Sequence, residues 1–239
     1  MAALFVSDLH LAPDNPGPLQ SFIQLLEGRA RAADRLFILG DLFELWIGDD
    51  YVDPAFEPLL DALQACTRSG TPVLLMHGNR DFLIGERFLR RSGCTRLDDP
   101  TLVELYGRRV LLMHGDLLCT DDVDYQRLRR QFRDPAWQRQ VLQRPVAERL
   151  AMARQARAAS DQATRDKPQA IMDVNPDAVV AALRESGADL LVHGHTHRPA
   201  THRLQVDGRA VQRIVLGDWY RAGSVLVLDA DGVETVSLL

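Results

Sequence analysis

The hydrophobic positions in the first third of the chain predict a repeated unit of strand, turn and helix. Short apolar runs at residues 3–7, 35–39 and 73–77 each end in a polar or glycine-containing turn. Between them, residues 18–32 and 54–69 carry apolar side chains at helical spacing. This alternation is typical of parallel strands joined by helices. Sheets of this kind bind their ligands at the carboxyl ends of the strands.

The second half of the chain changes to short strands separated by tight turns. Two Asp-Gly pairs, at 207–208 and 231–232, are strong hairpin signals. Apolar runs flank these and similar turns, at residues 101–105, 109–113, 204–206, 210–216, 224–228 and 233–238. They predict a second, largely antiparallel set of strands. Two facing sheets with helices outside, a four-layer αββα sandwich of the α/β class, would accommodate both halves.

Five short segments, in chain order, carry metal-binding side chains, and each lies at the end of a predicted strand. The segments are DLH, GD, GNRD, HGD and GHTH. Their candidate ligands are Asp8, His10, Asp41, Asn79, His114, His195 and His197. Taken alone, a GD pair is more often a turn, and a single histidine is more often a structural residue. Together, in this order, the donors are typical of a two-metal phosphoester hydrolase.

The spacing inside the segments predicts how the donors converge. Asp8 and His10 flank one residue at a strand end, so their side chains would leave on the same face. Asp41 has two carboxylate oxygens, which can bridge two ions. Asn79 offers a neutral amide oxygen that adds no negative charge beside a phosphate. In GHTH, strand alternation or a tight loop would place both rings on one side.

The series DxH, GD, GN, H and GHxH resembles the calcineurin-like metallophosphoesterases over residues 4–217, apart from one insertion. Within that superfamily, residues 40–50, 77–85 and 112–130 are similar to the enzymes of lipid A biosynthesis that act on UDP-2,3-diacylglucosamine. As in that branch, Arg80 follows Asn79 where a histidine is common elsewhere. The resemblance implies a hydrolase in which water attacks the α-phosphorus, releasing UMP and leaving diacylated glucosamine 1-phosphate.

The same resemblance implies two manganese ions that share Asp41. One would be held by Asp8, His10, Asp41 and His197, and the other by Asp41, Asn79, His114 and His195. A water molecule between two dications loses its proton near neutral pH and becomes a usable nucleophile. Ligand type alone does not distinguish manganese from other divalent metals. Glu44 has no counterpart in the ligand pattern and is left outside the metal set.

The resemblance also implies catalytic roles for Asn79, Arg80 and His195. The expected substrate contacts are Asn79, Arg80, Asp122, Ser160, Thr164, Lys167 and His195. The planar guanidinium of Arg80 matches phosphate oxygens, and a surface ion pair with Asp81 is the alternative. Ser160, Thr164 and Lys167 follow one another at helical spacing and would share one face. Lys167, the only lysine in the chain, is expected to donate to the glucosamine phosphate.

An insertion interrupts the series of ligands. The spacing from His114 to His195 is more than twice that between any earlier pair of segments. Residues 121–167 are predicted to form a helical lid over the metal site, and residues 1–120 and 168–239 to form the core. A surface helical bundle without substrate contact is the alternative. The apolar residues of the insertion would line an acyl-chain slot or pack onto the body; they include Phe132, Trp137, Leu142 and Met152.

The net charge of −5 conceals a basic segment. Residues 126–158 hold nine arginines against Asp134 and Glu148, a local balance of +7, so the remainder sums to −12. These arginines either solvate helix faces or form a surface that meets anionic lipid. Because the expected substrate lies in a membrane, we expect peripheral attachment to the cytoplasmic face of the inner membrane. The overall acidity argues against a nucleic-acid partner, and we expect a monomer.

Length and composition exclude several other classes. A chain of 239 residues suits one α/β domain with an insertion better than two equal domains. No run approaches the roughly 18 to 20 apolar residues that span a bilayer. The N-terminus enters a predicted strand at once, so we expect no export signal. Cys66, Cys94 and Cys119 are an odd number without CxxC spacing, which suits reduced thiols in the cytoplasm.

Two other functions are alternatives to the lipid A enzyme. One is a phosphoesterase that acts on a soluble nucleotide or diester. The other is a non-catalytic scaffold, which would lack some of the ligands.

Overall fold

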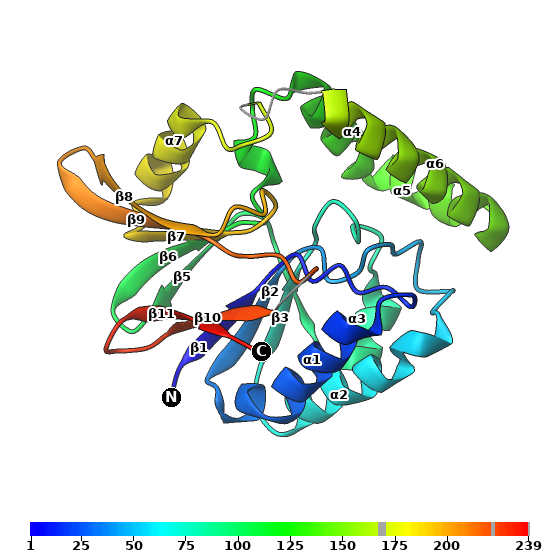
Figure 1. Ribbon diagram of the computed structural model, residues 1–239, viewed down its shortest axis with the longest axis horizontal. Helices are drawn as coiled ribbons and strands as arrows, with labels where there is room; N and C mark the ends of the chain where they lie inside the picture. Colours follow the sequence, from blue (N-terminus) through cyan, green and yellow to red (C-terminus); the bar gives the residue numbers. More distant parts are fainter. Residues whose placement is uncertain (167–170, 221–222, 239) are drawn as a thin grey trace.

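Two β-sheets lie face to face, with helices on their outer surfaces (Figure 1). The computed structural model describes residues 1–166, 171–220 and 223–238, and the side chains of residues 161–166 fall outside this description. The ligand-bearing loops gather at one end of the two sheets. The architecture is the predicted αββα sandwich.

The first sheet has the strand order β11-β10-β1-β2-β3-β4. Its parallel part is built from the predicted repeat, with β1 (Ala3–Val6), β2 (Arg35–Leu39), β3 (Val73–Met76) and β4 (Thr95–Leu97). The connecting helices are α1 (Pro16–Glu27), α2 (Glu57–Arg68) and α3 (Glu86–Ser92), with short 3-10 turns η1 (Arg29–Ala32) and η2 (Pro54–Phe56). They cover the outer face of this sheet (Figure 1). The hairpin of β10 (Ser224–Leu228) and β11 (Val233–Ser237) extends the sheet beside β1.

The second sheet has the order β5-β6-β7-β9-β8, with α7 (Pro176–Ser186) on its outer face. Its strands are β5 (Thr101–Leu105), β6 (Arg108–Leu112), β7 (Leu190–His193), β8 (Ala200–Val206) and β9 (Arg209–Val215). The pairs β6–β7 and β7–β9 are parallel, while β5–β6 and β8–β9 are antiparallel hairpins. The sheet is therefore mixed, because the long connection before β7 lets it return parallel to β6.

The prediction that every strand of the second half belongs to the second sheet is wrong. The hairpin of β10 and β11 joins the first sheet. Val225 faces the helical layer, whereas Leu226 and Leu228 face the space between the sheets. A strand with apolar side chains on both faces is stabilised where both faces are covered, and the edge beside β1 supplies that cover. A hairpin signal is local and does not specify which sheet edge the hairpin joins.

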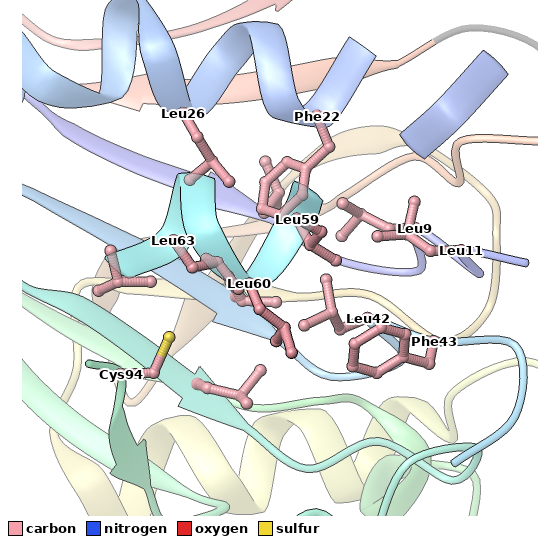
Figure 2. Close-up of a cluster of buried hydrophobic side chains, with 14 of the residues drawn as sticks. Leu9, Leu11, Phe22, Leu26, Leu42, Phe43, Leu59, Leu60, Leu63 and Cys94 are labelled. Carbon is pink, nitrogen blue, oxygen red and sulfur yellow. The ribbon is translucent and has the colours of Figure 1, made fainter. Parts of the chain in front are cut away.

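Three clusters of buried side chains form the three interfaces between the four layers. Alternate residues of one strand point into different clusters: Leu36 and Ile38 of β2 face α1 and α2, while Phe37 and Leu39 face the second sheet. In the second sheet, Leu111 and Leu191 face α7. Figure 2 shows part of the first cluster, in which side chains of α1 meet those of α2 and of the loops after β1 and β2.

The segment predicted as an insertion is helical in the structure. It contains α4 (Val123–Phe132), α5 (Pro135–Leu142) and α6 (Val146–Asp166). Asp122 and Asp134 cap the first two helices by accepting hydrogen bonds from backbone N–H groups of the first turn. The three helices project from the end of the sandwich that carries the ligand loops (Figure 1).

Within the described residues, none of the helices combines the length and the apolar character that a membrane span requires.

Candidate metal centre

The seven predicted ligands lie in loops at the carboxyl ends of β1, β2, β3, β6 and β7. The first three strands are parallel neighbours in one sheet, and the last two are parallel neighbours in the other. Because the two sheets face each other, both sets of strand ends meet at one end of the sandwich. The fold therefore brings together residues that are up to 189 positions apart in the sequence, from Asp8 to His197.

The backbone at these ligands is unusual. Five of the seven have a positive φ: Asp8 (53°), His10 (49°), Asp41 (52°), His195 (68°) and His197 (53°). Non-glycine residues rarely adopt this left-handed conformation, and it concentrates at functional sites. The strand-alternation argument for Asp8 and His10 is therefore wrong, because β1 ends at Val6. For GHTH, the tight loop is the arrangement that the chain adopts.

Two glycines permit the close approach of the ligand loops. A Cβ atom added to Gly78 would lie 2.0 Å from Oδ1 of Asp41, and one added to Gly194 would lie 2.1 Å from Oδ2 of Asp8. No side chain fits at such distances. Gly78 and Gly194, which precede Asn79 and His195, therefore allow these loops to pack directly against the carboxylates of Asp41 and Asp8.

One group of donors is formed by Asp8, His10 and His197. Nε2 of His10 lies 3.2 Å from Nε2 of His197, and Oδ1 of Asp8 lies 3.4 Å from the same His197 nitrogen. Oδ2 of Asp8 accepts hydrogen bonds from the Ser7 hydroxyl and the His195 backbone N–H. Oδ1 is buried and has no hydrogen-bond partner among the described residues. This oxygen is thus directed at the space between the two imidazoles.

A second group is formed by Asn79, His114 and His195. Oδ1 of Asn79 lies 3.0 Å from Nε2 of His114 and 3.0 Å from Nδ1 of His195. Nδ1 of His114 lies 2.9 Å from the Leu39 carbonyl oxygen, so the backbone of β2 orients this ring. The amide oxygen and the two imidazole nitrogens therefore converge on one point.

Asp41 lies between the two groups. Its Oδ2 is 3.9 Å from Nε2 of His10 and 4.0 Å from Nε2 of His114. Its Oδ1 accepts a hydrogen bond from the backbone N–H of Arg80 at 2.8 Å. One oxygen of Asp41 is thus directed at both groups, while the other fixes the orientation of the carboxylate.

The donors form a buried floor and a more open rim. Asp8, His10, Asp41 and His114 are nearly inaccessible to solvent. The residues of the site that are partly exposed are Asn79, Arg80, His195 and His197. A substrate that approaches from solvent therefore meets the second set first.

The buried carboxylates attract positive charge. Burial alone would lower the pKa of His114, but the charges of Asp41, Asp116 and Asp8 raise this pKa to about 9. Burial alone would raise the pKa of Asp8, yet the His197 ring, 3.4 Å from Oδ1, and the neighbouring imidazoles hold that pKa well below its usual range. Divalent cations supply the same positive charge, and they bind deprotonated carboxylates and neutral imidazoles.

The donor set therefore fits divalent metal ions. In each of two sets of residues, the possible ligand atoms lie within 4.8 Å of one another. One set is Asp8, His10 and His197, and the other is Asp8, Asp41 and His114. Carboxylate, amide and imidazole donors suit manganese, iron, zinc and similar ions. Asp8 belongs to both sets, and Asp41 lies between His10 and His114.

Sequence reasoning missed two buried carboxylates that support the ligand loops. Asp81 accepts hydrogen bonds from the backbone N–H groups of Gly78 and Leu42, each at 2.7 Å, and so ties two ligand loops together. The alternative that Arg80 forms a surface ion pair with Asp81 is therefore wrong, because Asp81 is fully buried. Asp116, in the HGD segment, is also fully buried. A signal was available, since both acidic residues stand within two positions of a predicted ligand.

The insertion is attached to the loops that carry the ligands. Asp116 accepts hydrogen bonds from the Tyr125 hydroxyl at 2.9 Å and from Nε of Arg129 at 2.8 Å. Arg133 donates to the carbonyl oxygens of His77 and Gly78. The first helix of the insertion is thus anchored directly beside Asn79 and His114.

The nine arginines of the basic segment divide into an inward set and an exposed set. The sequence predicted that they either solvate helix faces or meet anionic lipid, and neither interpretation includes the inward set. The arginines at 129, 133, 149 and 157 are at least partly buried, and all bond to the core. Arg149, for example, forms an ion pair with Asp50 and donates to the Ile47 carbonyl oxygen. The other five arginines are exposed, at 127, 130, 139, 144 and 154. Part of the local charge of +7 is therefore balanced by core carboxylates.

Within the described residues, the structure does not bring the predicted substrate contacts of the insertion together at one site. Asp122 caps α4 by accepting a hydrogen bond from the Tyr125 backbone N–H. Ser160 is exposed on α6. The side chain of Thr164 and the whole of Lys167 lie outside the described residues. The predicted roles of these four residues remain predictions.

Most of the apolar candidates for the acyl slot pack against the body. The Phe132 ring stacks on Phe82 at 5.1 Å between centroids, and Trp137 also contacts both rings. Trp137 and Met152 contact the first core cluster. Leu142 differs, because 40% of its surface is exposed. Packing of the insertion onto the body is therefore the observed role of three of the four.

A two-sheet sandwich with such donors at its strand ends defines a metal-dependent phosphoesterase. The sequence profile described as calcineurin-like phosphoesterase matches residues 1–199. This chain belongs to that family, as the motif series predicted.

Curated relatives are similar along nearly their whole length. The UDP-2,3-diacylglucosamine hydrolase of Stenotrophomonas maltophilia (strain K279a) is 52% identical, covering 97% of this chain and 96% of that protein. The protein of the same name from Xanthomonas oryzae pv. oryzae (strain PXO99A) is 51% identical, covering 98% of each. The solved structure of Yfce, a phosphoesterase from E. coli, aligns with a TM-score of 0.50 at 19% identity, covering 100% of this chain and 93% of Yfce. The last likeness shows the shared fold.

The buried ring of His193 gives the fold a defined pH dependence. Burial lowers the pKa of His193 from 6.5 to about 4. The unfolded chain therefore binds a proton at pH values where the folded protein keeps this ring neutral. The stability due to the neutral ring is complete above pH 6.5 and is lost as the pH falls towards about 4.

We expect His193→Gln to make the free energy of unfolding less dependent on pH between 6.5 and about 4. Urea titrations of chelator-treated protein at several pH values measure this slope. His202→Gln is the matched control: burial also lowers the pKa of His202, but this residue is only half-buried, so the slope should change less. Equal slopes for the wild type and His193→Gln would contradict the assignment.

Proposed function

We propose that this chain hydrolyses the pyrophosphate bond of UDP-2,3-diacylglucosamine, giving UMP and 2,3-diacylglucosamine 1-phosphate in lipid A biosynthesis. The observation that carries this proposal is the identity of 50–52% to hydrolases named for that substrate, over nearly the full length of each chain. The convergence of the predicted ligands on one centre supports hydrolysis at phosphorus.

The proposed centre holds two divalent ions, which we take to be manganese. Asp8, His10, Asp41 and His197 would hold one ion, and Asp41, Asn79, His114 and His195 would hold the other. When bound, two such ions lower the pKa of a water molecule and polarise a phosphoryl oxygen. The shared ligand would be Oδ2 of Asp41, since it is the oxygen directed at both groups.

The rim residues would orient the phosphate groups. The backbone N–H of Arg80 is fixed on Asp41, so the Arg80 side chain begins beside the centre. Its Nε is buried and has no hydrogen-bond partner within the part of the chain that the structure describes. A guanidinium placed there can donate to the oxygens on which negative charge increases during phosphoryl transfer. Asn79 and His195, which contact each other on the rim, would position the same group.

The insertion would recognise the rest of the substrate. Asp122, Ser160, Thr164 and Lys167 are the proposed contacts to the glucosamine phosphate and its neighbours, as the family resemblance implies. The position of the insertion on the ligand loops supports a lid, because its first helix is bonded to Asp116 beside His114. The exposed Leu142 is the member of the apolar set that remains accessible to an acyl chain.

The outward side of the insertion supports peripheral membrane attachment. Exposed arginines at 127, 130, 139, 144 and 154 share the insertion with the exposed apolar side chains of Val123, Leu128 and Leu142. Basic residues near an anionic bilayer surface gain on the order of 1 kcal/mol each. Exposed apolar side chains add insertion into the interface. We therefore propose that the chain binds the cytoplasmic face of the inner membrane as a monomer.

Turnover in oxygen-18 water tests the proposed reaction. With UDP-2,3-diacylglucosamine and manganese, we expect the label in UMP, because water attacks the α-phosphorus. Mass spectrometry of both products locates the label, and an Asp41→Asn variant controls for a contaminating hydrolase. Label in the glucosamine 1-phosphate would place the attack on the other phosphorus. Absence of turnover, with activity on soluble nucleotides or diesters, would favour the alternative phosphoesterase.

The substitution Arg80→Ala separates phosphate stabilisation from metal binding. We expect kcat to fall about 10²- to 10³-fold, the loss typical of removing one donor to a developing charge, with the metal content unchanged. Lys167→Ala should instead raise KM. Steady-state kinetics and elemental analysis measure these effects, with Arg90→Ala, on the exposed face of α3, as control. Unaltered kcat in Arg80→Ala would remove Arg80 from the mechanism.

Flotation with lipid vesicles tests membrane attachment. We expect binding to vesicles that contain anionic lipid, little binding to zwitterionic vesicles, and release at high salt. Arg130→Glu should weaken binding, because Arg130 is exposed on α4. Binding that is independent of salt and of lipid charge would count against the basic surface.

A further inference from the structure

His10 presents its two ring nitrogens to different neighbours. Nε2 faces the proposed metal centre, 3.9 Å from Oδ1 of Asp8 and 3.9 Å from Oδ2 of Asp41. Nδ1 points the other way and lies 2.9 Å from Oε2 of Glu44. A neutral imidazole that donates its proton from Nδ1 to a carboxylate keeps the Nε2 lone pair free for a metal ion. Glu44 therefore contacts the ligand on the side away from the centre.

The partner of His10 differs in kind from the partner of His114. His114 is oriented by the Leu39 carbonyl oxygen, which is part of β2 and cannot move separately from the sheet. His10 is oriented by a side chain from the loop after β2, and 24% of that side chain is exposed. The orientation of His10 thus depends on what holds Glu44.

Glu44 is held by residues from two other parts of the chain. Nη2 of Arg157, on α6 of the insertion, lies 3.0 Å from Oε1 of Glu44. The Tyr220 hydroxyl donates to Oε2 at 3.2 Å. The Tyr220 ring also stacks on His10, with centroids 4.8 Å apart and planes inclined by 9°. Each carboxylate oxygen of Glu44 therefore has a partner, and one of these partners comes from the insertion.

We propose that Glu44 is a positioning residue for His10, and that Arg157 connects the helical insertion to the metal position of Asp8, His10 and His197 through Glu44. The inference rests on the metal centre of the proposed function and does not depend on the identity of the substrate. Glu44 selects the ring tautomer and orientation of His10, and Arg157 fixes the rotamer of Glu44. Metal affinity at this position consequently depends on a contact made by the insertion.

The expected effects follow from the chemistry of each substitution. Removing the hydrogen-bond partner of a metal-binding histidine typically lowers metal affinity about 10- to 100-fold. We expect a loss of this size in Glu44→Ala at one of the two metal positions. Glu44→Gln should lose less, because its amide oxygen can take the place of Oε2 beside Nδ1 of His10. Arg157→Ala should lose several-fold, because Tyr220 still holds Glu44.

Titration of the full-length, chelator-treated protein with manganese tests this assignment. Calorimetry gives the affinity and stoichiometry of each position, and electron paramagnetic resonance of free manganese gives an independent measure. Arg154→Ala is the matched control, since Arg154 is an exposed arginine of the same helix, and its affinity should equal that of the wild type. The circular dichroism of each variant monitors the fold.

A double variant tests whether Arg157 acts through Glu44. If it does, Glu44→Ala with Arg157→Ala binds manganese as Glu44→Ala alone does. Independent, multiplicative losses would overturn the connection. Wild-type affinity in Glu44→Ala, with the fold intact, would overturn the positioning role. Substrate turnover is absent from these measurements, so failure of the proposed function on UDP-2,3-diacylglucosamine and failure of this inference are separate results.

Discussion

Asp41 brings one carboxylate oxygen between two groups of donors at the point where both sheets end. Burying a carboxylate costs several kcal/mol unless its oxygens are bonded or paired with positive charge. One oxygen accepts the Arg80 backbone N–H, and the other faces imidazoles of both groups. Burial still raises the pKa of Asp41, although the charges of His114 and His10 oppose it. The other contacts of the site reduce the free-energy cost of burying the Asp41 carboxylate.

Those contacts explain the loops. Gly78 must lack a side chain because Oδ1 of Asp41 occupies the place of its Cβ. Asp81 accepts hydrogen bonds from Gly78 and from Leu42, the residue after Asp41, and so links the two loops beside Asp41. The left-handed φ at Asp41 is strained for a residue with a side chain, and the surrounding hydrogen bonds maintain it.

The sequence predicted those features that depend on local pattern. The periods of apolar residues located the strands of the first sheet and both Asp-Gly hairpins, since a strand pattern and a turn are recorded within a few residues. It did not reveal that β10 and β11 join the first sheet, because the choice of edge depends on which faces are already covered. The seven candidate ligands were predicted from their order along the chain, and the structure brings them to one end of the sandwich; their binding of metal stays a prediction. Asp81 and Asp116 were missed because a buried acid resembles an exposed one in the sequence until its hydrogen-bond donors are known, which are backbone N–H groups for Asp81 and side chains for Asp116.

In the insertion, too, the sequence does not show which charged residues are buried. A run of arginines reads as a basic surface, yet Arg129 and Arg157 turn inward to Asp116 and Glu44. Both carboxylates lie beside candidate metal ligands, so without these arginines their negative charge would be close to that of other acids. The insertion therefore contributes counter-charges to the carboxylates beside the site. Because α4 contacts the loop of His114 and α6 contacts Glu44 beside His10, the charges of the insertion and of the proposed metal centre depend on one another.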